Sequence, residues 1–374
     1  MKIRSRFLSI LLVFSATLAP LSVGAEALPS EQAPIDWKLF QSLWLDGVPR
    51  ATPEEPRAAA FSEETATHFL DDVALRWVRK NQCGTCHTTV SYLMAHPQFG
   101  RGQQDPVRDE VRAGASAFAL NEAQQKTGIS TIIAGAAVAA FTVGDAPGSE
   151  LPADTRALFD YLWTTQRPDG SWGVDADGLL PFLERDPRYL ALMVTLAMGY
   201  APKEFREEKV PAAGLERLQG FLRRNPPDNL HDQAVLLWAS VRTPGVLTPK
   251  QRTGYLRSLL ALQRADGGWS LPSMGNWKRH GGTPNPKNGP SDGYATALAT
   301  LALCETGTGT SMAPAQRGVQ WLRTNQRESG RWFTASLFAD GFQNYLSNMA
   351  TAYALMAMHS CDARGQHQAA LSRR

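Results

Sequence analysis

The residues with the most distinctive chemistry are Cys83, Cys86 and His87, which form a C-x-x-C-H motif. Two cysteines at this spacing lie about one turn apart on a helix, and the adjacent histidine is a good iron ligand. In an exported chain this spacing is the attachment signature of c-type haem. The motif therefore predicts a haem c that Cys83 and Cys86 hold covalently, with His87 as the metal ligand on the haem iron.

The same residues fit two other kinds of site. One is a Cys83–Cys86 disulfide, because C-x-x-C pairs oxidise readily outside the cytoplasm. The other is a zinc site, although the chain has no second cysteine pair at a suitable spacing. If haem is bound, the ligand on the opposite face of the iron stays open. The candidates are methionine and histidine side chains: Met94, His96, Met193, His231 and His280.

A second group of reactive side chains is acidic. Glu184 and Asp186 open a predicted buried helix shortly after Asp175 and Asp177, and Asp292 opens another. Carboxylates at the mouth of a cavity can act as a general acid or bind a cation. Acids at a helix N-terminus also interact favourably with the helix dipole, and Asp292 suits an N-cap. We take Glu184, Asp186 and Asp292 as catalytic candidates and keep the dipole and capping interpretations beside them.

Three further residues are candidates for the wall of a ligand cavity. Tyr294 and Tyr353 lie on predicted buried helices, and His231 begins a third. Aromatic walls suit a hydrophobic ligand. Ordinary core packing uses the same side chains, so the sequence leaves both interpretations open.

The N-terminal residues predict export. Lys2, Arg4 and Arg6 precede a mostly apolar run over residues 7–19, and small residues lead to Ala25. This pattern is typical of a signal peptide over residues 1–25, and the run is shorter than the ~20 apolar residues of a membrane span. The formal net charge of +3 equals the three basic residues of the signal, so the mature chain is neutral. We expect a periplasmic or secreted protein with no transmembrane span and no nucleic-acid partner.

An internal repeat indicates the architecture. The phrase Q-R-x-x-G-x-W occurs three times, at residues 166–172, 263–269 and 326–332. Apolar residues at spacings of three and four precede each copy, which predicts an amphipathic helix that ends at the phrase. The glycine suits a left-handed turn after a helix, the glutamine amide can bond exposed carbonyls, and the tryptophan packs across the junction. We therefore expect the tryptophans to be structural.

A nearly uniformly apolar helix follows each copy, over residues 190–200, 291–304 and 346–359. Helices that are apolar all round are buried on both sides. Alternating outer and inner helices stack into a ring, so residues 62–362 are predicted to form an all-α domain, an α/α toroid. Degenerate repeats supply further helices at residues 69–81, 131–143, 215–222 and 231–240.

The remaining segments and cysteines lie around this ring. Residues 26–61 form a Pro- and Ala-rich lead-in, and residues 363–374 read as a flexible tail. Cys304 and Cys361 each end a predicted inner helix. They either form a disulfide at one rim or stay as two buried thiols.

The repeats resemble the QW repeats of the squalene–hopene cyclase and prenyltransferase superfamily, whose fold is an α/α toroid. More narrowly, the chain looks like a group of short, exported, bacterial squalene-cyclase-like proteins with a C-x-x-C-H motif in the first repeat, seen here at Cys83, Cys86 and His87. The phrases at residues 231–238 and 347–353 are also similar to that group. The resemblance implies a hydrophobic, isoprenoid-like small molecule or lipid as partner.

The sequence also departs from that superfamily. Squalene–hopene cyclases protonate an alkene with an aspartate of a D-x-D-D-T-A motif, and the nearest match here is residues 292–297. Tyr294 and Ala295 stand where the two acids would be. Protonating an unactivated double bond needs clustered carboxylates, so D-x-D-D polyene cyclisation is not expected. The zinc ligands of protein prenyltransferases are not recognisable either.

Three functions stay open. The first is a haem c redox protein or haem-dependent oxidoreductase, with a redox partner or a hydrophobic substrate. The second is a non-haem isoprenoid-modifying enzyme, terpenoid cyclase- or transferase-like, that uses the acids. The third is a binding or scaffold protein without chemistry. Fold alone does not choose among them.

Overall fold

The computed structural model describes residues 45–81, 86–99, 105–125, 150–172, 187–279, 284–307, 309–338 and 343–372. Regular structure in these ranges is helical, without a β-strand. The helices are α2 (Glu63–Asn81), η1 (Cys86–Val90), α3 (Ser91–Phe99), α4 (Pro106–Gln125), α6 (Ala153–Thr165), α7 (Pro187–Tyr200), α8 (Lys203–Glu207), α9 (Lys209–Arg224), α10 (Leu230–Arg242), α11 (Pro249–Ala261), η2 (Leu271–Ser273), α12 (Gly293–Thr306), α13 (Gly309–Asn325) and α14 (Gln343–Ser372).

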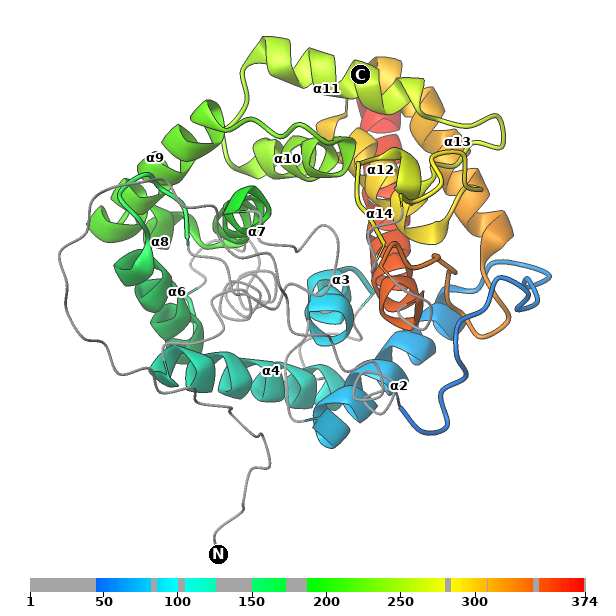
Figure 1. Cartoon of the computed structure of the whole chain (residues 1–374), viewed down its shortest axis with the longest axis horizontal. Coiled ribbons are helices and arrows are strands. Elements are labelled where there is room, and N and C mark those ends of the chain that lie inside the picture. The colour runs from blue at the N-terminus through cyan, green and yellow to red at the C-terminus, as the bar shows by residue number, and fades with distance from the viewer. Residues whose placement is uncertain are drawn as a thin grey trace, which may run out of the picture.

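These helices form two concentric layers (Figure 1). Helices α2, α4, α6, α8, α9, α11 and α13 lie outside, and α3, α7, α10, α12 and α14 lie inside. Among the described inner helices, α7 contacts α10, α10 contacts α12, α12 contacts α14 and α14 contacts α3. The predicted α/α toroid is thereby confirmed. The predicted helix over residues 131–143 lies outside the described residues.

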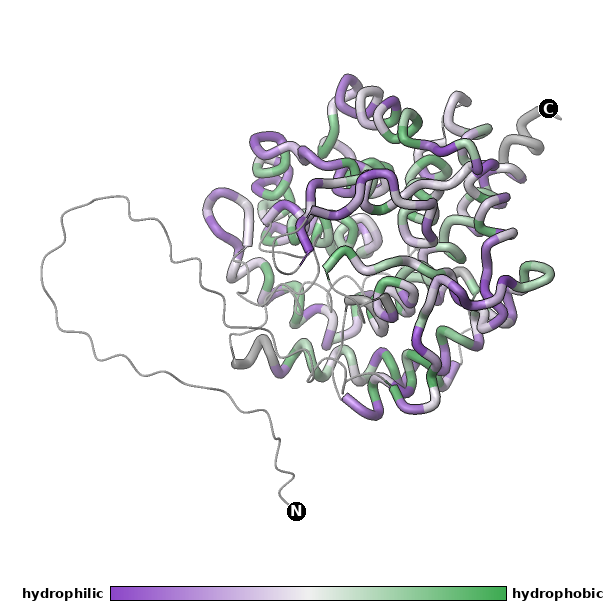
Figure 2. The backbone as a smooth tube through the Cα atoms, turned by 45° about the vertical axis from the view of Figure 1, so that its right-hand side comes forward, coloured by the Kyte–Doolittle hydropathy of each residue, from purple (hydrophilic) through white to green (hydrophobic). Residues whose placement is uncertain are grey.

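Burial explains the two layers. In α12 every residue from Gly293 to Cys304 is buried, so this helix has no polar face. In the outer helix α9 only one face is buried, including Gly214, Leu218 and Phe221, and the rest meets solvent. Figure 2 shows the same alternation of purple and green segments along the outer helices. The hydrophobic core therefore lies between the layers and within the inner one.

The three repeat turns share one hydrogen-bond pattern. In each, the glutamine Nε2 donates to the glycine carbonyl of its own turn and to a backbone carbonyl where another outer helix begins or passes. The pairs are Gln166 with Gly170 (3.1 Å) and Gly214 (3.0 Å), Gln263 with Gly267 (2.8 Å) and Pro314 (2.8 Å), and Gln326 with Gly330 (3.0 Å) and Ser62 (2.8 Å). The turn glycines have φ of 94°, 89° and 94°, in the left-handed region that favours glycine. Each repeat phrase thus connects the outer helix that it ends to another outer helix through the glutamine side chain.

The tryptophans of the phrases are structural, as predicted. Trp172, Trp269 and Trp332 are fully buried. Each indole Nε1 donates to a backbone carbonyl in the last turn of the preceding outer helix, at 2.9, 2.8 and 2.8 Å. A buried indole N–H with a partner leaves the ring free to fill the junction without an unpaired donor.

The third turn closes the ring. Gln326 bonds the carbonyl of Ser62 just before α2, and the Ser62 amide donates back to Gln326 Oε1 at 2.8 Å. The two residues are 264 positions apart. An added Cβ at Gly330 would lie 2.3 Å from the Thr65 carbonyl, so the closing contact requires glycine.

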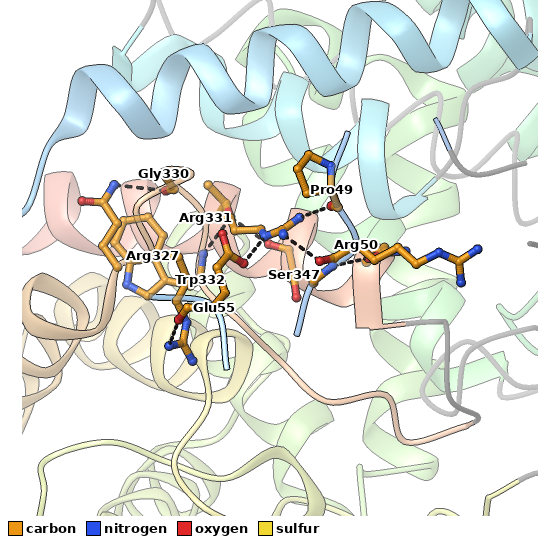
Figure 3. Close-up of polar contacts among 12 residues, drawn as sticks. Pro49, Arg50, Glu55, Arg327, Gly330, Arg331, Trp332 and Ser347 are labelled. Carbon is orange, nitrogen blue, oxygen red and sulfur yellow. Dashed lines mark hydrogen bonds and ion pairs between the residues drawn. The ribbon is translucent and has the colours of Figure 1, made fainter. Parts of the chain in front are cut away.

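A polar cluster around Arg331 adds to this closure (Figure 3). The Arg331 guanidinium bonds Glu55 (2.7 Å), the Pro49 carbonyl (2.8 Å) and the Arg50 carbonyl (3.0 Å), and it lies over the Phe69 ring. The Arg331 side chain is 1% exposed. The part of the lead-in from residue 45 onward therefore packs onto the third turn.

Two details concern the C-terminal region. Cys304 and Cys361 form a disulfide between α12 and α14, which decides between the two alternatives left open by the sequence. Helix α14 continues to Ser372, so most of the segment predicted as a tail after residue 362 is helical. No helix in the described ranges combines the length and apolar character that crossing a membrane requires.

Candidate functional site

His231 is the centre of a buried hydrogen-bond chain. It is the second residue of α10, where the Asn229 side chain caps the helix by accepting from the Asp232 amide. The His231 Nδ1 lies 2.8 Å from Asp232 Oδ1, and its Nε2 lies 3.0 Å from the Tyr294 hydroxyl on α12. His231 and Tyr294 have no exposed surface, and Asp232 is buried. The tertiary fold thus joins Asp232, His231 and Tyr294 in a line.

The donors and acceptors assign the protons in this chain. A carboxylate only accepts, so we assign the Nδ1 proton of His231 to its bond with Asp232. The Nε2 of a neutral imidazole then accepts the Tyr294 hydroxyl proton. Burial raises the pKa of Tyr294 well above its usual value, reinforced by the nearby Tyr353, so the hydroxyl keeps its proton at neutral pH. The arrangement is a Tyr–His hydrogen bond beside an acceptor carboxylate.

Aromatic side chains surround this chain. The rings of Tyr189 on α7 and Trp277 on the loop before α12 each lie 5.8 Å from the His231 ring, centroid to centroid. Tyr353 on α14 lies 5.2 Å from Tyr294 and is also its hydrogen-bond partner. The predicted trio of His231, Tyr294 and Tyr353 is therefore brought together, within one aromatic cluster on four helices and the loop before α12.

Asp292 lies at the start of α12, two residues before Tyr294. It is the N-cap of this helix, and its side chain accepts the Ala295 amide, as the capping interpretation expected. Asp292 is 8% exposed. Burial raises its pKa to about 6, against the effect of the donors that bond its carboxylate.

Several other predicted site residues fall partly or wholly outside the part of the chain that the structure describes. Cys83, Glu184 and Asp186 lie outside the described residues, as do Asp175, Asp177 and His280. Cys86 and His87 have a described backbone, which is the start of the π-helical turn η1, but their side chains lie outside the description. This turn packs against α14 and α2.

The structure narrows the candidates for a second haem ligand. Both ring nitrogens of His231 are hydrogen-bonded, so we remove it from the iron-ligand candidates. The His96 Nε2 lies 3.0 Å from Asp105 Oδ2, and Met94 and Met193 are buried. Across the described side chains, no group of three or more His, Cys, Asp or Glu is placed to hold a metal ion.

Sequence reasoning missed several members of the site. Asp232 directly follows His231, and an acid next to a histidine at a helix start was a usable signal. Tyr189 and Trp277 carried no such signal, because an aromatic residue in a helix or loop is most often core packing. Arg331 belongs to the ring closure and not to this site. It could have been noticed because the other two phrases have Ser171 and Gly268 at the same position.

Comparisons with known proteins agree with this fold. Residues 250–363 match the family model of the squalene-hopene cyclase C-terminal domain. The unsaturated glucuronyl hydrolase from Bacillus sp. GL1 superposes with a TM-score of 0.53 at 13% identity, over 79% of this chain and 95% of that chain. The ent-copalyl diphosphate synthase from Streptomyces platensis has a TM-score of 0.48 at 17% identity. That match covers 74% of this chain and only 50% of the synthase, so this chain spans half its length.

The class of protein follows from the fold and the family match together. The described residues form an α/α toroid, and residues 250–363 of it are similar to the C-terminal domain of squalene-hopene cyclases. Among curated proteins, none matches the sequence significantly.

Proposed function

We propose that this protein is an exported toroid enzyme that transforms a hydrophobic, isoprenoid-like small molecule by proton transfer through Asp232, His231 and Tyr294. The observation that carries the proposal is the His231 imidazole held between a carboxylate at 2.8 Å and a tyrosine hydroxyl at 3.0 Å. Tyr294 occupies the position of an acid in the D-x-D-D-T-A motif.

The chain of hydrogen bonds suits general base chemistry. The ligand must carry a C–H bond that an adjacent carbonyl makes acidic. When the Tyr294 oxygen takes that proton, the C–H electron pair passes to the ligand carbonyl as an enolate and the Tyr294 hydroxyl proton passes to His231 Nε2. Asp232 stabilises the imidazolium that forms. Because the pKa of Tyr294 is raised by burial, a free phenolate is not populated, and the histidine must accept the proton in the same step.

A ligand can reach the Tyr294 hydroxyl only if neighbouring side chains move. His231 and Tyr294 are fully buried, whereas Tyr189 and Tyr353 beside them keep 4% and 3% of their surface exposed. A ligand therefore reaches the Tyr294 hydroxyl by displacing one of these rings. An apolar ligand gains free energy there because the surrounding walls are aromatic.

The test uses incubation of purified protein in D2O with geranylgeranial, whose carbonyl makes a C–H bond acidic, and with squalene, which has no such bond, followed by mass spectrometry of the extracted lipid. We expect a product, or deuterium incorporation, that falls about 10²-fold or more in Tyr294→Phe. Tyr200→Phe is the matched control, because Tyr200 is a partly buried tyrosine at the other end of α7 from Tyr189, and its hydroxyl accepts from Trp238 Nε1. Wild-type protein that neither binds nor labels either lipid would refute the proposal.

Export belongs to the same proposal. The predicted signal peptide and the Cys304–Cys361 disulfide both support an oxidising compartment, such as the periplasm. Cleavage after Ala25, measured by mass spectrometry of the mature protein, tests it.

We also propose a covalent haem c at Cys83, Cys86 and His87 as a second candidate function. The C-x-x-C-H motif supports it, together with the helical backbone that begins at Cys86 and packs on α14. Haem would supply one-electron redox chemistry and require a redox partner. Visible absorbance that survives denaturing electrophoresis, and that the double variant Cys83→Ala with Cys86→Ala lacks, is expected. A colourless protein from a host that matures c-type cytochromes would leave the disulfide and zinc interpretations.

A further inference from the structure

Asp292 connects three separate segments. Its Oδ2 accepts the Leu271 amide at 2.5 Å, from the loop that follows the second repeat turn. Its Oδ1 accepts the Ala295 amide at 3.0 Å, within α12, and the Thr334 hydroxyl at 3.2 Å, just after the third repeat turn. Both carboxylate oxygens are therefore occupied by donors of the protein itself.

Thr334 links the Asp292 carboxylate to the backbone of Tyr294. Its hydroxyl donates to Asp292 and at the same time accepts the backbone amide of Tyr294 at 2.8 Å. The Thr334 amide is itself held by the Ser347 hydroxyl at 3.1 Å. The backbone position of Tyr294 thus depends on a hydroxyl whose orientation Asp292 sets.

The third turn and the start of α12 are tightly packed against each other. The Gly293 amide donates to the Phe333 carbonyl at 3.0 Å. An added Cβ at Gly293 would lie 2.6 Å from Cβ of Trp332 and 3.1 Å from Cβ of Ala350. A small shift of residues 332–334 must therefore move the first turn of α12, and the Tyr294 hydroxyl moves with it.

We propose that Asp292 is a positioning residue, which through Thr334 fixes the first turn of α12 and holds the Tyr294 hydroxyl at hydrogen-bond distance from His231. This inference rests on the proposed acid–base role of Tyr294 and assigns Asp292 a place in it. Asp292 is not itself one of the groups that exchange a proton with the ligand in this proposal, because its carboxylate oxygens accept from two backbone amides and the Thr334 hydroxyl.

The test removes one link at a time. Thr334→Val keeps the side-chain shape but deletes the hydroxyl between Asp292 and Tyr294, and Thr334→Ser restores a hydroxyl. Asp292→Ala removes all three acceptor contacts. Thr296→Val is the matched control. The Thr296 side chain is as buried as that of Thr334 and lies on α12 close to Tyr294, but its hydroxyl bonds the backbone of Trp269 rather than that of Tyr294.

The readout is the ¹⁵N resonance of His231 Nε2 in histidine-labelled protein, identified among the seven histidines by its loss in His231→Gln. A shift of this resonance is expected in Thr334→Val and Asp292→Ala, with near-wild-type positions in Thr334→Ser and Thr296→Val. Near-ultraviolet circular dichroism checks that each variant is folded.

Two results would overturn the inference. One is an unchanged His231 resonance in both Thr334→Val and Asp292→Ala, and the other is an equal shift in Thr296→Val. The readout needs no substrate. Wild-type protein that is inactive on isoprenoids but shows the expected resonances would therefore defeat the proposed function and leave the positioning role of Asp292 intact.

Discussion

The first and third repeat turns have the same local structure but connect different parts of the chain. Gln166 bonds the carbonyl of Gly214, 48 residues away, whereas Gln326 bonds that of Ser62, 264 residues away. The residue before the tryptophan is Ser171 in the first turn and Arg331 in the third. Closing a longer loop costs more chain entropy. The same turn structure is therefore enough to connect neighbouring outer helices in the first repeat, whereas the third turn, which closes the ring, is supported by a buried polar cluster as well.

The largest expected effect is that of Arg331→Ala. It leaves the Glu55 carboxylate and the carbonyls of Pro49 and Arg50 without their donor, so the free energy of unfolding should fall by about 3 kcal/mol or more. Ser171→Ala, the equivalent change in the first turn, loses only a local bond to Asp169 and should cost about 0.5–1 kcal/mol. Urea unfolding monitored by circular dichroism measures both. Equal losses would contradict the distinction between the two turns.

Removing the disulfide should have the next largest effect. The Cys304–Cys361 bridge closes a loop with a sequence separation of 57 next to the closing repeat. The double variant Cys304→Ser with Cys361→Ser should lower the free energy of unfolding by about 2–4 kcal/mol. The loss should appear equally on reduction of the wild-type protein with dithiothreitol. No change on reduction would show that the bridge does not form in solution.

The glutamines provide a direct comparison of equivalent residues. Gln326 is 1% exposed and bonds both the amide and the carbonyl of Ser62, whereas Gln166 is partly exposed. Gln326→Ala should therefore cost about 2–3 kcal/mol and Gln166→Ala about 1 kcal/mol. Hydrogen exchange should show loss of protection at the start of α2 in the first variant only. A uniform loss across the ring in both variants would refute separate roles.

The smallest expected effect is a dependence on pH. The pKa of Asp292 is raised by burial to about 6, so the folded state binds this proton more tightly than the unfolded state. Its contribution to stability is complete below the unfolded pKa near 4 and is lost as pH rises through the folded pKa. Between pH 7 and pH 5 the protein should gain about 1 kcal/mol from this group. Asp292→Asn should lack this gain in urea unfolding at the two pH values, and an unchanged slope would exclude Asp292 as its source.

Much of the architecture could be predicted from the sequence. The three Q-R-x-x-G-x-W phrases predicted three joints, and the apolar stretches after them predicted the inner helices α7, α12 and α14. The helix starts differ from prediction by a few residues, because the sequence signal for a cap is weaker than the hydrophobic pattern. Helix α14 runs beyond residue 362, where the sequence has no sustained apolar pattern that would predict it.

The site was only partly predictable. His231, Tyr294 and Tyr353 were named as cavity candidates, but nothing in their spacing showed that His231 and Tyr294 share a hydrogen bond. Asp292 looked like a catalytic acid or a cap from its place at a helix start. Its contacts with Leu271 and Thr334 depend on two loops whose conformations the sequence does not encode locally.

The sequence by itself determined the repeat, the alternation of inner and outer helices and the turn at each phrase, because these follow from hydrophobic periodicity and local backbone chemistry. Only the tertiary structure decided that Gln326 closes the ring on Ser62, that Cys304 pairs with Cys361 and that His231 meets Tyr294. These contacts join residues 264, 57 and 63 positions apart. Their geometry depends on how the stacked helices curve into a ring, which no single segment specifies.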